Sequence, residues 1–111
     1  MKRGEIWWAT LDKRRPVLLL SRQEAYAVRA MVIVAPVTTT FRGFSVEVKL
    51  GKREGLPREC VVSADWLVTV PKIDLLERAG ALSAAKLRQV DDALRFALGL
   101  GSLDGVSYSG A

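Results

Sequence analysis

The sequence predicts a mainly β fold with α (α+β), in which a small barrel of short strands is followed by one packed helix. Runs of strand-forming residues recur along residues 5–82, with turn-forming residues about every eight to twelve positions. An apolar stripe at helical spacing then follows between residues 83 and 98. The chain has 111 residues, half of them apolar, which is enough for one domain with a hydrophobic core.

The first strand is predicted at residues 5–11 (EIWWATL), where strand formers dominate. Because side chains alternate along a strand, Ile6 and Trp8 should share one face and Trp7 the other. One tryptophan should therefore face the core and the other the surface or a partner. Packing in the core or at a dimer contact is favoured over stacking on a base, although an exposed tryptophan could do the latter.

The next strands and loops follow the same logic. A turn at residues 12–14 leads to strands at 15–21, 30–37 and 44–50, with loops at 22–26 and 38–43. Pro16 lacks a backbone donor and should open its strand or lie at an edge. Residues 30–37 (AMVIVAPV) are apolar throughout, which indicates a fully buried strand. Residues 44–50 alternate strictly, so we expect a buried face made by Phe44, Val46, Val48 and Leu50.

The second half should contain shorter strands and the helix. A charged connection at residues 51–59 precedes one or two strands within 60–70, broken near Asp65. Pro71 should start a helical turn, and residues 77–82 a last strand. Ser83 is a candidate helix N-cap, and the helix should end at Gly99 and Gly101. Its apolar stripe is expected in the core or at a dimer interface: Leu87, Val90, Leu94 and Leu98. Residues 1–100 should form the domain, and 101–111 a loose tail.

Charge is unevenly distributed along the chain. The formal net charge is +5, but residues 1–58 hold 12 Lys and Arg against five acids, and residues 59–111 hold five against seven. The first half therefore offers a candidate anion-binding surface, although a solvated basic face without a partner is an equal alternative. Lys52, Arg53 and Arg58 belong to this alternative, with long-range steering of RNA as their other possible role.

Several kinds of chemistry are excluded by composition. There is no histidine, so the chain has no imidazole acid or base and no histidine metal site. Cys60 is the only cysteine, which rules out an intrachain disulfide and predicts an inert core thiol. We find no phosphate-binding glycine motif, no signal peptide and no apolar run long enough to span a bilayer, so a cytoplasmic protein is expected.

Cations and hydroxyls remain, and both gather at predicted strand ends. "DKRRPVLLLS" (12–21) and "APVTTTFRG" (35–43) each place polar side chains beside a buried strand. Guanidinium groups and threonine hydroxyls suit phosphate, because the first offers a permanently charged fork of donors and the second a further donor. The alternative is that the arginines are turn residues and that the threonines satisfy backbone groups.

The order of the motifs resembles the MazF/PemK family of toxin endoribonucleases. The resemblance runs from Lys2 to about Leu100 through "KRGEIWWATL", "RRPVLLLS", "VAPVTTTFRG", "EVKL", "CVVSADWLVTVPKIDLLERAGALS" and "VDDALRFALGL". It implies an SH3-like barrel of the MazF/CcdB/Kid type with about five to seven strands. It also implies a homodimeric endoribonuclease without metal or other cofactor, which cleaves single-stranded RNA and is neutralised by an acidic antitoxin.

The resemblance also implies site residues. The family's catalytic arginine precedes the proline of its second strand, which matches Arg15, and its catalytic threonine follows the "AP" strand, which matches Thr38. Neighbouring candidates for contacts to RNA are Lys13, Arg14, Thr39, Thr40 and Arg42, with Ser21 as a further candidate at the end of the second strand. Trp66 beside Asp65 is a candidate groove residue.

The implied reaction is attack by an RNA 2′-hydroxyl on the adjacent phosphate, which gives a 2′,3′-cyclic phosphate and a 5′-hydroxyl. Arg15 would stabilise the phosphorane and could donate a proton to the leaving oxygen, while Thr38 would position the phosphate or the nucleophile. A guanidinium is a poor general base, and no other residue of the sequence stands out for that role. DNA lacks the 2′-hydroxyl and should not be cut.

One departure from the family pattern limits what the resemblance implies. Many members carry a longer loop between the first two strands, whereas "LDKRRP" crosses in a few residues. The cleavage sequence and the geometry of antitoxin binding therefore do not carry over. Two other functions stay open: a gyrase-inhibiting toxin of the CcdB type, and a barrel that binds nucleic acid without cleaving it.

Overall fold

The computed structural model describes residues 1–101, so the predicted tail lies outside the described residues except for Gly101. The strands are β1 (Glu5–Thr10), β2 (Arg14–Leu19), β3 (Met31–Thr38), β4 (Glu47–Leu50), β5 (Cys60–Ser63), β6 (Val68–Pro71) and β7 (Leu75–Ala81). The helices are α1 (Ala25–Val28), α2 (Ala84–Ala97) and the single 3₁₀ turns η1 (Lys52–Glu54) and η2 (Lys72–Asp74). The mainly β fold with a C-terminal helix is confirmed.

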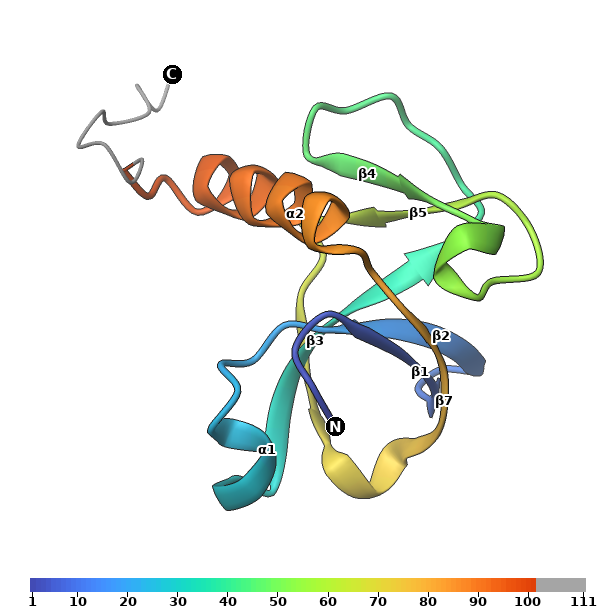
Figure 1. Cartoon of the computed structure of the whole chain (residues 1–111), viewed down its shortest axis with the longest axis vertical. Helices are drawn as coiled ribbons and strands as arrows, with labels where there is room; N and C mark the ends of the chain where they lie inside the picture. Colours follow the sequence, from blue (N-terminus) through green and yellow to red (C-terminus); the bar gives the residue numbers. More distant parts are fainter. Residues whose placement is uncertain (102–111) are drawn as a thin grey trace.

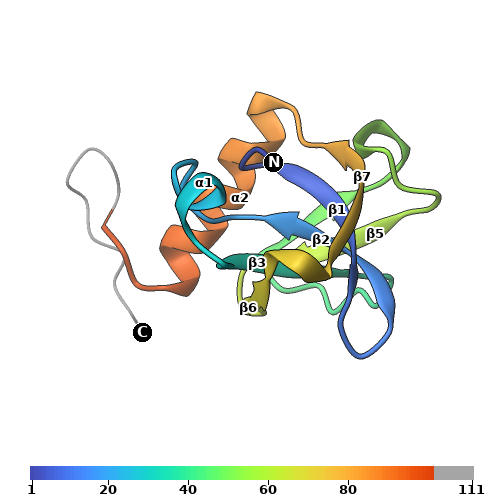
Figure 2. The same ribbon diagram turned by 90° about the horizontal axis from the view of Figure 1, so that it is seen from below.

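Antiparallel pairing joins these strands into one curled sheet (Figure 1). The order is β4-β5-β3-β2-β1-β7, and β6 pairs with the first half of β3. β3 is thus the central strand, since its second half pairs with β5 and it also pairs with β2. In Figure 1, α2 lies with β4 and β5 at one end of the molecule, and α1 and η2 lie at the other end. Figure 2 looks along this direction from below, so α1 is seen in front of α2.

The core consists of two apolar clusters on opposite faces of β2 and β3. Leu18 and Val37 face the cluster that α2 covers, whereas Val17 and Val34 face the second cluster with Tyr26 and Leu75. Burial on both faces explains why these two strands are continuous apolar runs rather than alternating ones.

Two side chains of β3 depart from the expected full burial. Met31 and Ile33 are exposed, because the face of β3 that carries them at this end is left uncovered within the described part of the chain. Residues 22–26, expected as a loop, lead instead into the short helix α1.

The strand predicted at residues 44–50 is shorter than its alternation suggested. β4 begins only at Glu47, so Val46, Val48 and Leu50 are buried as expected, but Phe44 is 59% exposed. Residues before Glu47 form a turn that carries Phe44 away from the core. The last strand, in contrast, begins earlier than predicted, because η2 ends at Asp74 and β7 follows directly.

Helix α2 begins at the predicted cap. The Ser83 hydroxyl accepts a hydrogen bond from the Lys86 N–H at 3.1 Å, which satisfies one of the free donors of the first turn. Val90 and Leu94 pack into the core as expected, whereas Leu98 follows the last helical residue and is exposed. Gly99 then takes a left-handed conformation (φ +69°), as is common after a helix end.

The barrel closes where η1 meets β7, through contact between backbones. A Cβ built on Gly80 would lie 1.9 Å from the carbonyl oxygen of Glu54, and one on Gly55 would lie 2.4 Å from the carbonyl oxygen of Ala79. Gly55 also has φ +90°, which other residues rarely adopt. Only residues without a side chain allow the approach, and we call this contact the glycine seam.

Substitution at the glycine seam should therefore destabilise the fold. For Gly80→Ala we expect a loss of about 1–3 kcal/mol in the free energy of unfolding, as for other overpacked sites, measured by urea denaturation. Gly51→Ala is the matched control, because its Cβ would meet no atom of residues 1–101 closer than 4.0 Å. Equal stability of the two variants would contradict the close contact.

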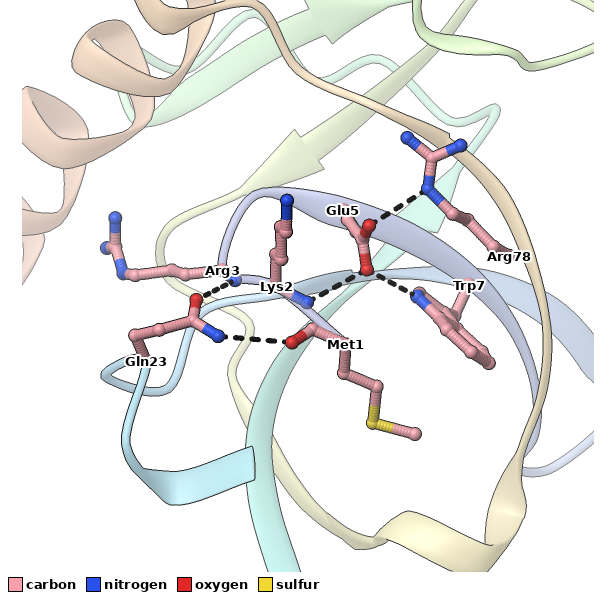
Figure 3. Close-up of polar contacts among 7 residues, drawn as sticks. All are labelled: Met1, Lys2, Arg3, Glu5, Trp7, Gln23 and Arg78. Carbon is pink, nitrogen blue, oxygen red and sulfur yellow. Dashed lines mark hydrogen bonds and ion pairs between the residues drawn. The ribbon is translucent and has the colours of Figure 1, made fainter. Parts of the chain in front are cut away.

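A network of polar contacts fixes the start of β1 (Figure 3). The Glu5 carboxylate accepts hydrogen bonds from the Lys2 N–H at 2.8 Å and the Trp7 indole at 3.1 Å, and pairs with Arg78 of β7 at 3.0 Å. The Gln23 side-chain amide donates a hydrogen bond to the Met1 carbonyl and accepts one from the Arg3 N–H. The network therefore ties β1 both to β7 and to the segment before α1.

Acid should weaken this network. Burial by itself would raise the pKa of the Glu5 carboxyl, but the hydrogen bonds from Trp7 and Lys2 and the Arg78 guanidinium hold it below its ordinary 4.5. The stabilisation is therefore present above about pH 4.5 and is lost as the pH falls through the lowered pKa.

We expect Glu5→Gln to be less stable than wild type at pH 7, with a smaller difference at pH 3. The measurement is urea denaturation at both pH values. A difference that does not shrink in acid would show that the charge of Glu5 is not what stabilises β1.

Candidate functional site

The pairing of β2 with β3 brings the two predicted catalytic residues together. Val17 pairs with Pro36, and continuing that antiparallel register by two residues sets Arg15 opposite Thr38. Both side chains line the same two clefts in the surface. The hairpin before β2 is as short as the sequence indicated, since Leu11 and Lys13 already bond across the turn.

The Arg15 guanidinium is partly enclosed. One terminal nitrogen lies 3.2 Å from the Asp12 carboxylate, the group lies 5.2 Å from the centre of the Trp66 ring, and only 13% of the side chain is exposed. Its Nε is buried without a hydrogen-bond partner among the described residues. A buried donor without an acceptor is costly, and an anionic oxygen bound there would remove that cost.

The loop after β3 is shaped by two side-chain acceptors. Thr38 Oγ1 accepts a bond from the Thr40 N–H at 3.1 Å, which tightens the turn. The Glu47 carboxylate accepts from three successive N–H groups, those of Arg42 at 3.2 Å, Gly43 at 2.8 Å and Phe44 at 3.2 Å. Glu47 thus holds the segment that carries the threonines and Arg42 in one conformation. Thr38 also bonds to the backbone, as expected if the threonines satisfy backbone groups.

Two clefts meet at this pair of strands. The first, of about 540 Å³, is lined by Trp8, Lys13, Arg14, Arg15, Pro16, Val37, Thr38, Thr39, Thr40, Leu56, Pro57, Arg58 and Cys60. The second, of about 500 Å³, is lined by Arg15, Thr38, Thr40, Arg42, Phe44, Glu47, Ser63, Asp65 and Trp66. All predicted site residues except Ser21 line one or both clefts.

Arg14 is held at the rim of the first cleft. It pairs with Glu77 of β7 at 2.6 Å and lies 4.7 Å from the centre of the Trp8 ring. Trp8 is therefore the tryptophan of β1 that faces the site, whereas Trp7 packs against the second core cluster. Both Arg14 and Glu77 are more than half exposed, so their pair contributes little stability.

Ser21 lies away from both clefts. It is buried, and its Oγ accepts a hydrogen bond from the Ile33 N–H at 2.7 Å. Six residues of strand separate it from Arg15, or about 20 Å. The hydroxyl thus serves the β2–β3 pairing at the end opposite the clefts.

Sequence reasoning assigned no site role to Glu47 or Phe44 and left Arg58 as a solvated cation. The alternating pattern of residues 44–50 gave no sign of a site role for Phe44 or Glu47, because it placed Phe44 in the core and Glu47 on an exposed face. A glutamate following a glycine-containing loop at a strand start is the signal that could have indicated a loop anchor. Cys60 is buried as expected, and burial, with the Glu54 charge adding to it, raises the pKa of its thiol.

Two further findings concern the described residues. Within positions 1–101, no group of three His, Cys, Asp or Glu side chains is placed to hold a metal ion. No helix in that part of the chain is both long and apolar enough to cross a membrane.

The fold and the site define a small β barrel with a cationic, hydroxyl-lined cleft suited to a phosphodiester. The model of the PemK-like, MazF-like toxins of type II toxin–antitoxin systems matches residues 2–98. The chain therefore belongs to this toxin family.

Individual relatives agree with this assignment. The probable endoribonuclease MazF5 of Mycobacterium tuberculosis is 37% identical over 99 residues, covering 86% of this chain and 91% of that protein. Among solved structures, the M. tuberculosis toxin MazF-mt6 is 39% identical with a TM-score of 0.84, covering 88% of this chain and 99% of that one. A mycobacterial endoribonuclease in complex with its cognate antitoxin is 28% identical with a TM-score of 0.83, covering 92% and 98%.

Removing the Glu47 anchor should loosen the loop after β3. In Glu47→Ala, we expect the amides of residues 42–44 to exchange hydrogen at least about tenfold faster, because bonds to a charged acceptor are among the stronger ones. Glu47→Gln keeps one acceptor oxygen and should lie between wild type and Glu47→Ala. Hydrogen exchange followed by NMR measures this, and unchanged rates at these three amides would contradict the anchoring role.

Proposed function

We propose that this toxin is a metal-independent, sequence-selective endoribonuclease that cleaves single-stranded RNA at the Arg15–Thr38 pair. The observation that carries the proposal is the opposition of these two side chains across β2 and β3, with no acceptor for the buried Nε of Arg15 in the part of the chain that the structure describes. The names of its relatives support the activity: the M. tuberculosis relative is described as a probable endoribonuclease.

The proposed reaction uses the nucleophile of the RNA itself. The 2′-oxygen bonds to the adjacent phosphorus and loses its proton, while the bond from phosphorus to the 5′-oxygen breaks and that oxygen takes up a proton. The products are a 2′,3′-cyclic phosphate and a 5′-hydroxyl. Arg15 stabilises the charge that develops on the phosphoryl oxygens, which is often the largest catalytic contribution. The Thr38 hydroxyl holds the phosphate in position for attack by the 2′-oxygen.

Partners follow from the same family assignment. We propose that the toxin acts as a homodimer and that an acidic antitoxin neutralises it, as the solved complex of a related endoribonuclease with its cognate antitoxin suggests. The cations around the first cleft would attract such an antitoxin as well as RNA. Inhibition of translation, and hence of growth, would follow from cleavage of cellular RNA in the cytoplasm.

The test is incubation of the purified protein with a long single-stranded RNA in excess EDTA, followed by mapping of the new ends. Wild type should give discrete cuts with 5′-hydroxyl ends and should leave a DNA of the same sequence intact. Arg15→Ala should cut at least about 100-fold more slowly, because a positioned charge is lost. Thr38→Val should also be slower, whereas Thr69→Val, on the exposed face of β6, is the matched control.

Other outcomes would point elsewhere. Intact RNA with steeply salt-dependent binding would indicate a barrel that binds nucleic acid without cleaving it. Intact RNA together with inhibition of DNA gyrase would indicate a toxin of the CcdB type. Cleavage abolished by EDTA would overturn metal independence alone.

A further inference from the structure

The two clefts diverge from one shared centre and differ in chemistry. Arg15, Thr38 and Thr40 line both of them. From there the first cleft runs toward the β1–β2 turn and residues 56–58, and the second toward the β5–β6 turn and the start of β4. A strand of RNA whose scissile phosphate lies at the shared centre would therefore place its two flanks in unlike surroundings.

The first cleft is cationic. Besides Arg15 it is lined by Lys13, Arg14 and Arg58, and no carboxylate of residues 1–101 is among its lining residues. Asp12 and Glu77, which pair with Arg15 and Arg14, lie outside this lining. Lys13 and Arg58 are exposed, and the Trp8 ring, the one aromatic ring of the described lining residues, is already covered on one face by Arg14. Long exposed cations bind phosphate without regard to the base, so the first cleft is suited to the RNA backbone rather than to particular bases.

The second cleft has the groups that distinguish bases. Phe44 and Trp66 are 59% and 40% exposed, and bases stack on such rings. The exposed carboxylate of Asp65 can accept hydrogen bonds from amino groups of bases. Among the described residues that line this cleft, Arg42 is the one cation beyond the shared centre.

The loop that carries Phe44 is also ordered in advance. Glu47 binds the N–H groups of Arg42, Gly43 and Phe44, so the backbone beneath the ring is fixed before any ligand arrives. Selection among bases requires groups held in place, because an adaptable surface accommodates all of them.

We propose that the site divides into a phosphate-binding flank in the first cleft and a base-reading flank in the second, so that sequence selectivity arises on one side of the scissile phosphate. The proposal rests on the proposed function for the position of that phosphate. The base-reading flank would favour bases with an exocyclic amino group. The Asp65 carboxylate would accept a hydrogen bond from that amino group, while the Phe44 or Trp66 ring stacks on the base. The phosphate-binding flank would supply affinity that is independent of sequence and sensitive to salt.

The experiment measures binding rather than cleavage. A random pool of single-stranded RNA with 2′-fluoro groups in place of every 2′-hydroxyl cannot be cut through the proposed reaction. The pool is bound to the full-length protein, the bound fraction is sequenced, and affinity is measured against salt concentration. The variants are Phe44→Leu and Asp65→Asn for the second cleft and Arg58→Gln for the first. Phe96→Leu and Arg88→Gln, which line neither cleft, are the matched controls.

Phe44→Leu should flatten the base enrichment seen with wild type, and Asp65→Asn should reduce the enrichment of amino-bearing bases, both with an unchanged salt dependence. Arg58→Gln should weaken binding to all sequences alike and lower the salt slope by about 0.7, as expected for one lost phosphate contact on a single strand. The controls should match wild type.

The proposal is overturned if Phe44→Leu and Arg58→Gln change enrichment and salt slope in the same way, or if wild type fails to bind the pool. Failure of the proposed function is a separate result. In that case unmodified RNA stays intact with wild type, while the two classes of variant still differ in the binding experiment.

Discussion

The pairing of β2 with β3 is the interaction on which the rest of the structure depends. Residues 17–19 of β2 and 34–37 of β3 are apolar and buried on both faces, so hydrophobicity alone does not fix their register. Polar contacts fix it at the far end, where Leu20 donates to Ile33 and the Ser21 hydroxyl accepts from the Ile33 N–H. At the near end the same register sets Arg15 against Thr38. A slip of one residue would therefore disturb the core and the site together.

The site uses groups whose charge does not change near neutral pH. Guanidinium groups stay protonated and hydroxyls stay neutral, and without histidine no imidazole titrates beside them. The protein controls instead where these groups point: Asp12 and Trp66 hold Arg15, and Glu47 holds the loop after Thr38. Preorganisation of fixed charges suits a reaction in which negative charge develops on phosphoryl oxygens.

Local patterns predicted the elements well but placed some side chains wrongly. Apolar runs identified the strands, Ser83 the start of α2 and Pro71 the helical turn η2. These features depend on residues that are close together in the sequence. Phe44 was wrongly placed in the core, since alternation cannot show where a turn ends and a strand begins. The opposition of Arg15 and Thr38 needs the β2–β3 register, which composition does not contain; resemblance to a known family supplied it. The role of Glu47 depends on three backbone groups that only the folded loop brings together.

The glycine seam between η1 and β7 has a consequence for the dimensions of the site. Residues 56–58 follow Gly55 directly and form one wall of the first cleft. Because the seam is backbone against backbone, side-chain size does not set the distance between η1 and β7 at Gly55 and Gly80. Leu56 belongs both to this wall and to the core cluster that α2 covers, so the seam fixes the end of the wall at Gly55 and core packing fixes the rest.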